Sequence, residues 1–311
     1  MTATLEPRSL QERLQRRIEI ERDAERTGRT FRKHANRIKL ERCLIKPLLN
    51  AALHGCRLYK RGVRNALRPV ITKIQLRFHG LPEQFDGFQI LHLSDLHIDC
   101  VPELAERVAA VLDGLRPDVC LMTGDYRFDI EGACYDAWAG MRIVLSGISA
   151  RHGVFGILGN HDPSEMAHAL QSMGVQMLIN DSAELKLGGE SLWLAGIDDP
   201  YDFRCDDLDA ALADVPPRAV KILLAHTPDL YRQAAESGVA LYLCGHTHAG
   251  QIRLPWIGSI IQNSDAPRSF THGQWSYREM HGYTSRGIGC SMLPVRFNCT
   301  PEIALIELQA N

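Results

Sequence analysis

Short apolar runs alternate with amphipathic stretches along the chain from Phe88 onward. The runs have the length of buried strands, and the stretches between them carry apolar residues at helical spacing. This alternation predicts an α/β fold with at least one largely parallel, buried sheet. The expected strands are 88–93, 119–123, 154–158, 175–179, 184–187, 192–195, 221–225 and 239–244, and the expected helices are 102–115, 133–148, 163–173 and 228–237.

The first quarter of the chain has a different pattern. Residues 6–42 are rich in Arg and Glu with few apolar positions, which favours an exposed helix or a partly disordered segment. Residues 38–59 place apolar side chains at roughly helical spacing among lysines and arginines, with Pro47 expected to kink or divide the helix. Such a helix fits the surface of an anionic membrane, or it packs its apolar face on the body.

Charge separates the chain into two parts. Residues 1–75 contain 19 Lys+Arg and 7 Asp+Glu, whereas residues 76–311 contain 16 and 30. We therefore expect a basic helical extension over 1–75 and an acidic domain over 76–311. Nine cysteines without Cys-x-x-Cys spacing are typical of reduced thiols. Without a secretory signal or a long apolar run, the expected location is cytoplasmic, at the inner face of the membrane.

Polar side chains of metal-ligand type follow five of the expected strands. Because strand carboxyl ends line one crevice in α/β folds, these side chains are expected to converge. A single one of them has ordinary structural explanations, such as a helix cap or a buried histidine, but five coincident strand ends favour a shared site. The residues are Asp95, His97, Asp125, Asn160, His161, His226, His246 and His248.

The number of donors indicates more than one ion. Two carboxylates, one amide oxygen and at least four imidazoles exceed the four to six ligands of a single ion. Two divalent ions that share a bridging carboxylate use all of them. Mixed oxygen and nitrogen donors without thiolate favour manganese, iron or zinc, with manganese as our first expectation. Such a site activates water for displacement at phosphorus.

In order and spacing, Asp95-Leu96-His97, Gly124-Asp125, Gly159-Asn160-His161-Asp162, His226 and Gly245-His246-Thr247-His248 resemble the calcineurin-like metallophosphoesterase family, over about residues 86–308. The resemblance implies a four-layer αββα sandwich of two packed mixed sheets flanked by helices. It implies that Asp125 bridges the ions, that His161 protonates the leaving oxygen and that Asp162 orients His161. The remaining implied ligands are Asp95, His97 and His248 for the first ion, and Asn160, His226 and His246 for the second.

The segments 245–253, 285–289, 293–297 and 301–303 are similar to a bacterial branch of membrane-associated phosphodiesterases and UDP-2,3-diacylglucosamine pyrophosphatases. That similarity implies a phosphodiester or pyrophosphate bond, in a lipid-linked substrate, as the target. Arg286 and Arg296 are expected to contact phosphate, because guanidinium groups bind phosphate oxygens through two hydrogen bonds. Trp256, Trp275 and Tyr283 either line an apolar pocket or pack within loops.

Two other functions stay open from the sequence. A metal-dependent nuclease or nucleotide phosphodiesterase would use the basic arm to hold nucleic acid, although the acidic body opposes a long polyanion. A non-catalytic scaffold on the same fold should have lost some ligands, and every ligand position here is filled. The partners expected are therefore a phosphate-containing substrate and an anionic membrane, with the oligomeric state left open.

Overall fold

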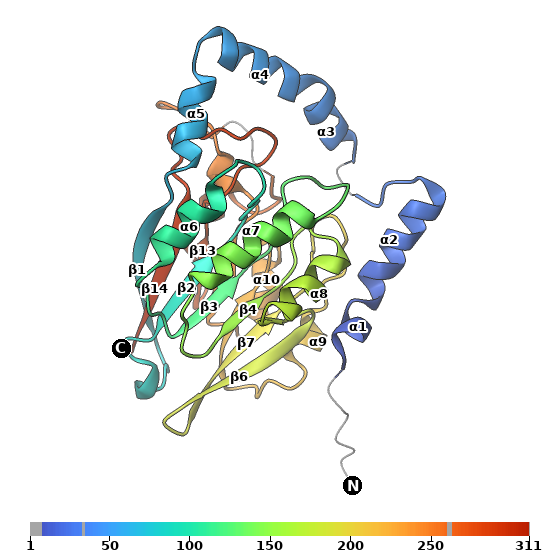
Figure 1. Cartoon of the computed structure of the whole chain (residues 1–311). Helices are drawn as coiled ribbons and strands as arrows, with labels where there is room; N and C mark the ends of the chain where they lie inside the picture. Colours follow the sequence, from blue (N-terminus) through green and yellow to red (C-terminus); the bar gives the residue numbers. More distant parts are fainter. Residues whose placement is uncertain (1–7, 33–34, 260–262, 311) are drawn as a thin grey trace.

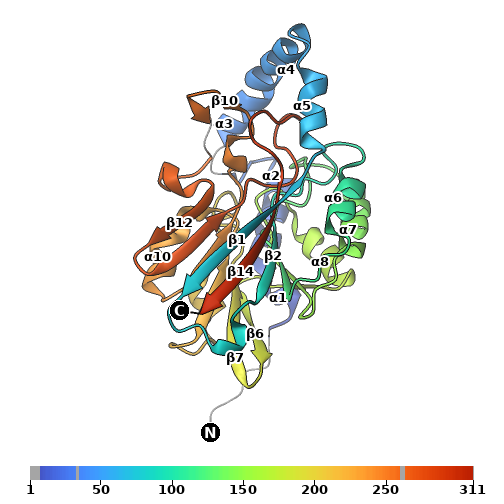
Figure 2. The same ribbon diagram turned by 90° about the vertical axis from the view of Figure 1, so that its left-hand side faces the viewer.

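The computed structural model describes residues 8–32, 35–259 and 263–310. Two six-stranded sheets pack face to face, and helices cover their outer faces (Figures 1 and 2). A third, two-stranded sheet joins β10 (Arg253–Leu254) to β11 (Gly258–Ser259). The predicted four-layer αββα sandwich is confirmed.

The first sheet has the order β1-β14-β2-β3-β4-β5. The strands from β2 to β5 are parallel to one another, β14 is antiparallel to β2, and β1 is parallel to β14. Its inner strands are buried on both faces, which explains their continuous apolar sequence. The strands are β1 (Val70–Phe78), β2 (Gln89–Leu93), β3 (Val119–Met122), β4 (Val154–Gly156), β5 (Val175–Met177) and β14 (Glu302–Ala310).

The second sheet has the order β12-β13-β9-β8-β7-β6, and only its two edge strands are antiparallel to their neighbours. The hairpin of β12 and β13 lies in a region where the sequence pattern predicted no helix or strand. Its Trp275 and Tyr283 side chains are buried. The strands are β6 (Asp181–Leu187), β7 (Glu190–Gly196), β8 (Val220–Leu224), β9 (Leu241–Cys244), β12 (Gly273–Tyr277) and β13 (Met280–Thr284).

Three apolar clusters hold the layers together. One lies between the two sheets, one between the first sheet and its helices, and one between the second sheet and its helices. The first sheet is covered by α6 (Leu104–Leu112), α7 (Tyr135–Ser146) and α8 (Ser164–Ser172), and the second by α9 (Leu208–Leu212) and α10 (Tyr231–Glu236). The expected helices are therefore present, with shorter ends than the sequence suggested.

The expected boundary between the extension and the body, at residues 75 and 76, falls inside strand β1. This strand pairs with β14 along its whole length, from Val70 opposite Glu302 to Phe78 opposite Ala310. Ile74, Leu76 and Phe78 alternate with exposed residues and are buried in the cluster between the sheets. Lys73 and Arg77 lie on the opposite, exposed face of the strand. Their basic charge therefore led the sequence reasoning to assign a strand of the body to the extension.

Residues 6–42 were expected to form an exposed helix or a partly disordered segment. The part of this segment that we call the arm, residues 8–32, is helical and exposes many side chains, but its apolar side is buried. Helix α2 (Gln15–Thr27) contacts α8, and α1 (Leu10–Arg13) contacts β6 (Figure 1). Leu10, Leu14 and Ile18 are buried in the cluster that includes the helices of the first sheet. Three apolar side chains at i, i+4 and i+8 are enough to dock a helix that is otherwise charged. Residues 6, 7, 33 and 34 of the segment lie outside the described chain.

A long helical segment follows the arm and stands away from the sheets (Figure 1). It consists of α3 (Ala35–Leu40), a π-helical turn (Glu41–Ile45) and α4 (Lys46–Gly55), and α5 (Tyr59–Ala66) follows. Pro47 has no N–H to donate, and the π turn directly before α4 divides the helix as predicted. In the described part of the chain, no helix is both long and apolar enough to cross a membrane.

Candidate metal centre

Five strands end at one edge of the sandwich, and the predicted ligands follow their last residues. β2, β3 and β4 come from the first sheet, whereas β8 and β9 come from the second. Within each sheet these strands are parallel, so their carboxyl ends lie together. The side chains brought into one cluster are those of Asp95, His97, Asp125, Asn160, His226, His246 and His248.

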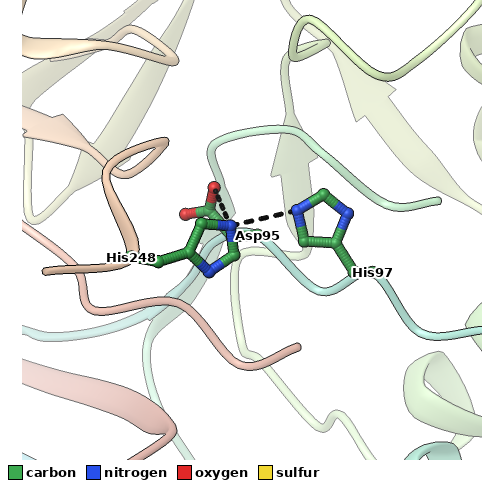
Figure 3. Close-up of side chains that lie close together, drawn as sticks. All are labelled: Asp95, His97 and His248. Atoms are coloured by element: carbon green, nitrogen blue, oxygen red, sulfur yellow. Dashed lines mark hydrogen bonds and ion pairs between the residues drawn. The ribbon is translucent and has the colours of Figure 1, made fainter. Parts of the chain in front are cut away.

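The first group of ligand atoms belongs to Asp95, His97 and His248, and these atoms lie within 4.8 Å of one another. His248 Nε2 is 3.1 Å from His97 Nε2 and 3.5 Å from Asp95 Oδ1 (Figure 3). All three residues are buried. Two imidazole nitrogens and a carboxylate that face one point suit a cation, because their lone pairs would otherwise repel one another.

The second group contains Asp125, His226 and His246, again with ligand atoms within 4.8 Å of one another. His226 Nε2 lies 3.2 Å from His246 Nδ1 and 3.0 Å from Asn160 Oδ1, so the amide oxygen joins this group. The two histidines of the His-x-His pair therefore face different groups. His246 lies with the second group, and His248 lies with the first.

Asp125 lies between the two groups. Its Oδ2 is 3.3 Å from His226 Nε2 in one group and 3.6 Å from His97 Nε2 in the other. One carboxylate oxygen within reach of both groups is the arrangement that a bridging ligand requires. The donor set thus fits two divalent ions, although the assignment of each residue as a ligand stays a prediction.

The backbone of the site is held in an uncommon conformation. For residues other than glycine, a positive φ costs about 1–3 kcal/mol and is concentrated at functional sites. The packing of both sheets around these loops must supply that free energy. The predicted ligands with positive φ are Asp95 (49°), His97 (36°), Asp125 (57°), His246 (66°) and His248 (49°).

Backbone carbonyls set the tautomers of two histidines. His97 Nδ1 is 2.6 Å from the Arg127 carbonyl oxygen, and His226 Nδ1 is 2.8 Å from that of Thr123. A carbonyl only accepts hydrogen bonds, so Nδ1 carries the proton in both rings. The lone pair on Nε2 is then directed into the cluster, where an ion would need it.

Burial and neighbouring charges act in opposite directions on the pKa values of this cluster. Burial opposes ionisation of Asp125, but His226 and His161 outweigh burial and hold the pKa of Asp125 well below its usual range. Burial alone would lower the pKa of His226, yet the Asp125 carboxylate raises it to about 10. At Asp95, burial dominates and raises the pKa. The cluster therefore places buried carboxylate and imidazole groups next to one another.

Two glycines allow the chain to approach the ligands closely. A Cβ atom at Gly245 would overlap Ser94 Oγ and the Asp95 carboxylate, and one at Gly159 would overlap the Asp125 carboxylate. Any larger residue at either position would displace a predicted ligand. In the sequence, this constraint is visible as a glycine directly before a predicted ligand, with Gly245 before His246 and Gly159 before Asn160.

His161 lies at the border of the cluster, where its side chain keeps 16% exposure and its Nε2 is 4.0 Å from Asp125 Oδ2. Its Nδ1 is 2.7 Å from the Phe128 carbonyl oxygen. Nδ1 therefore carries a proton, and Nε2 is the atom that would exchange a proton with a substrate. Burial lowers the pKa of His161 to about 3, and an adjacent phosphate anion would raise it again.

The expectation that Asp162 orients His161 was wrong. The Asp162 carboxylate instead accepts hydrogen bonds from the backbone N–H groups of Asp125, Tyr126 and Gly159, at 2.7–2.9 Å. These bonds fix the two loops that carry Asp125 and Asn160 against each other. The orienting contact for His161 comes from a main-chain carbonyl, which no side-chain motif could reveal.

The two arginines expected to contact phosphate both bond to protein groups. The Arg286 guanidinium pairs with Glu302, with Nη2 2.9 Å from Oε1, and also donates to Thr72. Arg296 is fully buried and donates to the carbonyl groups of Gly287 and Gly289. For Arg296 this geometry argues against a phosphate contact, because its nitrogens already have acceptors and it is fully buried. A phosphate contact of the partly exposed Arg286 stays a prediction.

The sequence analysis did not identify several residues that line the pocket next to the cluster. Ile38 and Lys46 come from the long helical segment, and Tyr201 and Asp202 come from the loop after β7. The Tyr201 ring centre is 4.2 Å from that of His246. A signal was present for this loop, because Asp198, Asp199 and Asp202 follow another strand end. No comparable signal marks Ile38 or Lys46, since their helix is remote in sequence.

Substituting His161→Ala is expected to lower kcat by about 10²–10⁴-fold, which is the usual contribution of a general acid. The variant should still bind two ions, because His161 is predicted to donate a proton rather than to bind metal. Steady-state kinetics and metal analysis of the dialysed protein measure both quantities. The exposed His168→Ala, seven residues along the chain, is the control. Loss of one ion would instead identify His161 as a ligand.

Comparison with known proteins agrees with this geometry. Residues 88–250 match the family described as calcineurin-like phosphoesterase. The chain is 32% identical over 230 residues to phosphodiesterase YaeI of Escherichia coli (strain K12), which covers 71% of this chain and 82% of that protein. It is 31% identical over 238 residues to the uncharacterized metallophosphoesterase YkuE of Bacillus subtilis (strain 168), with 74% and 82% covered.

A solved structure with similarity to the chain is that of the Thermus thermophilus sulfate thiohydrolase SoxB. The TM-score is 0.44 and the identity 12%, over 74% of this chain and 57% of that one. The sequence matches are the stronger finding, because the family match covers more than half of the chain and contains every predicted ligand. The chain therefore belongs to the calcineurin-like phosphoesterase family, whose members typically bind two divalent metal ions, and it is a metal-dependent phosphoester hydrolase.

Proposed function

We propose that the protein hydrolyses a phosphodiester or pyrophosphate bond in a lipid-linked substrate at the cytoplasmic face of the membrane, with manganese as its working ion and iron or zinc as alternatives. The observation that carries this proposal is the position of the helical segment 35–55. Its Ile38 and Lys46 line the same pocket as Asp125, His161 and the other residues of the metal centre. The same segment also exposes a stripe of leucines to solvent.

The leucine stripe supports a membrane-facing surface. Leu40, Leu44 and Leu48 follow one another at intervals of four residues and are 52%, 51% and 62% exposed. The opposite side of α4 packs Leu49 and Leu53 against the body. Neither face of this helix is polar throughout, which is unusual for a helix that contacts only water.

A second apolar element lies at the same end of the molecule. Figure 2 shows β10 beside the helical segment, and the turn after β10 carries Trp256 and Ile257, which are 104% and 70% exposed. Among the residues whose side chains the structure describes, the exposed cations in and directly after the helical segment include Lys39, Arg57 and Lys60. Leucine and tryptophan side chains can enter the boundary of the acyl chains, and lysine side chains can pair with the anionic headgroups of a bilayer. A lipid-linked phosphate would then lie close to the pocket.

The residues of the pocket suit hydrolysis at phosphorus. Two divalent ions, when bound, would lower the pKa of a shared water and stabilise negative charge on phosphate oxygens. Asp125 and the histidines would hold them, and Asp95 and Asn160 would complete the two sets. His161 Nε2 can deliver a proton to the leaving oxygen, because Nδ1 is fixed by the Phe128 carbonyl. Lys46 adds positive charge at the mouth of the pocket.

The substrate is tested by comparing hydrolysis of four compounds by the manganese-loaded protein. These are UDP-2,3-diacylglucosamine, bis-p-nitrophenyl phosphate, p-nitrophenyl phosphate and single-stranded RNA. We expect the highest kcat/KM for the lipid-linked pyrophosphate, with the generic diester second. The relative named as a phosphodiesterase supports a diester or anhydride over a monoester. Preference for RNA would establish the nuclease alternative, and inactivity on all four would overturn the proposal.

Membrane binding is tested by flotation with vesicles of phosphatidylglycerol, compared with vesicles of phosphatidylcholine. The wild type should float with the anionic vesicles, and the double variant Leu44→Asp/Leu48→Asp should bind at least tenfold more weakly, because burying each leucine contributes about 1.5–3 kcal/mol. Ser191→Asp, in the β6–β7 hairpin at the other end of the molecule, is the matched control. Equal flotation of the wild type and the double variant would contradict the proposed surface.

A further inference from the structure

The arm packs against the loop that carries Asn160 and His161. This loop begins after β4 and is followed by α8, and the arm lies on its outer side. Glu21 of α2 accepts hydrogen bonds from the backbone and side chain of Ser164, the first residue of α8. The region that matches the family starts at residue 88, so the arm lies outside the matched region.

Arg17 fixes the backbone of this loop from behind. Its side chain is fully buried, and its guanidinium donates to the carbonyl oxygen atoms of Gly159 and Asp162. The same guanidinium pairs with Asp198, with Nη2 2.6 Å from Oδ1, and its Cζ lies 3.8 Å from the centre of the Phe203 ring. A buried arginine with acceptors on two loops holds the loops at a fixed separation.

Arg32 makes a second connection, closer to the predicted ligand. Its Nη1 donates to the Asn160 carbonyl oxygen at 2.7 Å and to Asp202 Oδ2 at 2.6 Å. Asp202 Oδ2 also accepts from the side-chain amide of Asn160, with Nδ2 at 3.3 Å. Arg32, Asp202 and Asn160 thus form a closed set of contacts around one carboxylate oxygen.

These contacts decide which end of the Asn160 amide faces the metal centre. An amide binds a cation through its oxygen and not through its NH₂ group. Asp202 Oδ2, which pairs with the Arg32 guanidinium, accepts hydrogen bonds, so it selects the orientation that turns Nδ2 toward itself. Oδ1 then points to the second group, 3.0 Å from His226 Nε2. Asp202 is buried, and its Oδ2 pairs with Arg32 Nη1 at 2.6 Å.

We infer that Arg32, through Asp202, is a positioning residue for the second metal ion, and that the arm is therefore part of the active centre. The arm holds the loop and presets the rotamer of Asn160 before an ion binds. Outer contacts of this kind typically change metal affinity or activity by about 10–100-fold. The inference rests on the predicted dinuclear site and not on the identity of the substrate.

Isothermal titration of the full-length, metal-free protein with Mn²⁺ tests the inference without any substrate. The wild type should bind two ions. Arg32→Met should keep the first ion at wild-type affinity and bind the second about 10–100-fold more weakly. Asp202→Asn should have the same effect, because an amide can donate as well as accept and no longer selects the Asn160 orientation. Arg32→Lys keeps a charged donor and should recover part of the affinity.

Kinetics with a generic diester give an independent readout. In Arg32→Met, kcat should return toward the wild-type value as Mn²⁺ is raised, whereas KM at saturating metal should stay unchanged. If Arg32→Met were merely unstable, added Mn²⁺ would not restore its kcat unless the midpoint of thermal unfolding also rose. Arg29→Met, on the exposed part of the arm, is the control. If Arg32→Met does not fold, the titrations of Arg32→Lys and Asp202→Asn test the inference instead. Wild-type affinity for both ions in both of these variants would overturn the inference.

Discussion

Replacing Asp125 with asparagine is expected to lower hydrolysis by at least 10³-fold and to leave the purified protein with less than two bound ions. The change keeps the shape of the side chain but removes its negative charge. Asp125 Oδ2 lies 3.3 Å from His226 Nε2 and 3.6 Å from His97 Nε2, so both groups lose their shared anion. Metal analysis after dialysis and single-turnover kinetics on a generic diester measure the two effects.

The control for this variant is Asp214→Asn, which makes the same chemical change at an exposed position. Circular dichroism should show both variants folded, because asparagine has nearly the same shape as aspartate. An Asp125→Asn protein with two tightly bound ions and wild-type kcat would show that this residue does not bridge them. The dinuclear assignment would then have to be abandoned.

Removing the buried guanidinium of Arg17 is expected to have the largest effect on stability. In Arg17→Met, Asp198 would stay buried without its partner, and two loop carbonyl groups would lose their donor. Removing one partner of a buried ion pair costs about 3–5 kcal/mol. Urea unfolding monitored by circular dichroism and by tryptophan fluorescence should show this loss as a lower transition midpoint.

Arg16→Met is the matched control, because Arg16 is the neighbouring residue and its side chain is exposed. It should change the free energy of unfolding by less than about 0.5 kcal/mol. The double variant Arg17→Met/Asp198→Asn should recover part of the loss, since it also removes the buried charge. Equal midpoints for Arg17→Met and the wild type would mean that the arm contributes little to the folded state.

Much of the site could be predicted because its ligands follow strand ends. Strands of parallel sheets have one direction, so Asp95, Asp125 and Asn160 must reach the same edge once the strands are recognised. The division of His246 and His248 between two groups also follows from the family resemblance, and the structure places them accordingly. Their role as ligands stays a prediction that the Asp125 and Arg32 experiments address.

Arg296 and Asp162 show where sequence reasoning failed, and Arg286 has a partner that the sequence did not indicate. Each was assigned by residue type and by proximity in sequence to a motif. A guanidinium or a carboxylate serves whichever partner is nearest in space, and here those partners are Glu302, loop carbonyl groups and backbone N–H groups. Such partners have no sequence pattern, because every residue carries the same main-chain groups.

The sequence by itself determined the alternation of strands and helices and the candidate ligand set, because hydrophobic periodicity and strand-end motifs are local properties of the chain. The four-layer αββα arrangement was implied by the family resemblance. Only the tertiary structure decided what the basic first quarter does. Its charge predicted an exposed arm, yet three apolar residues dock it, β1 adds a strand to the first sheet, and Arg17 and Arg32 contact the catalytic loop. These are contacts across more than a hundred residues of sequence, and only folding brings their partners together.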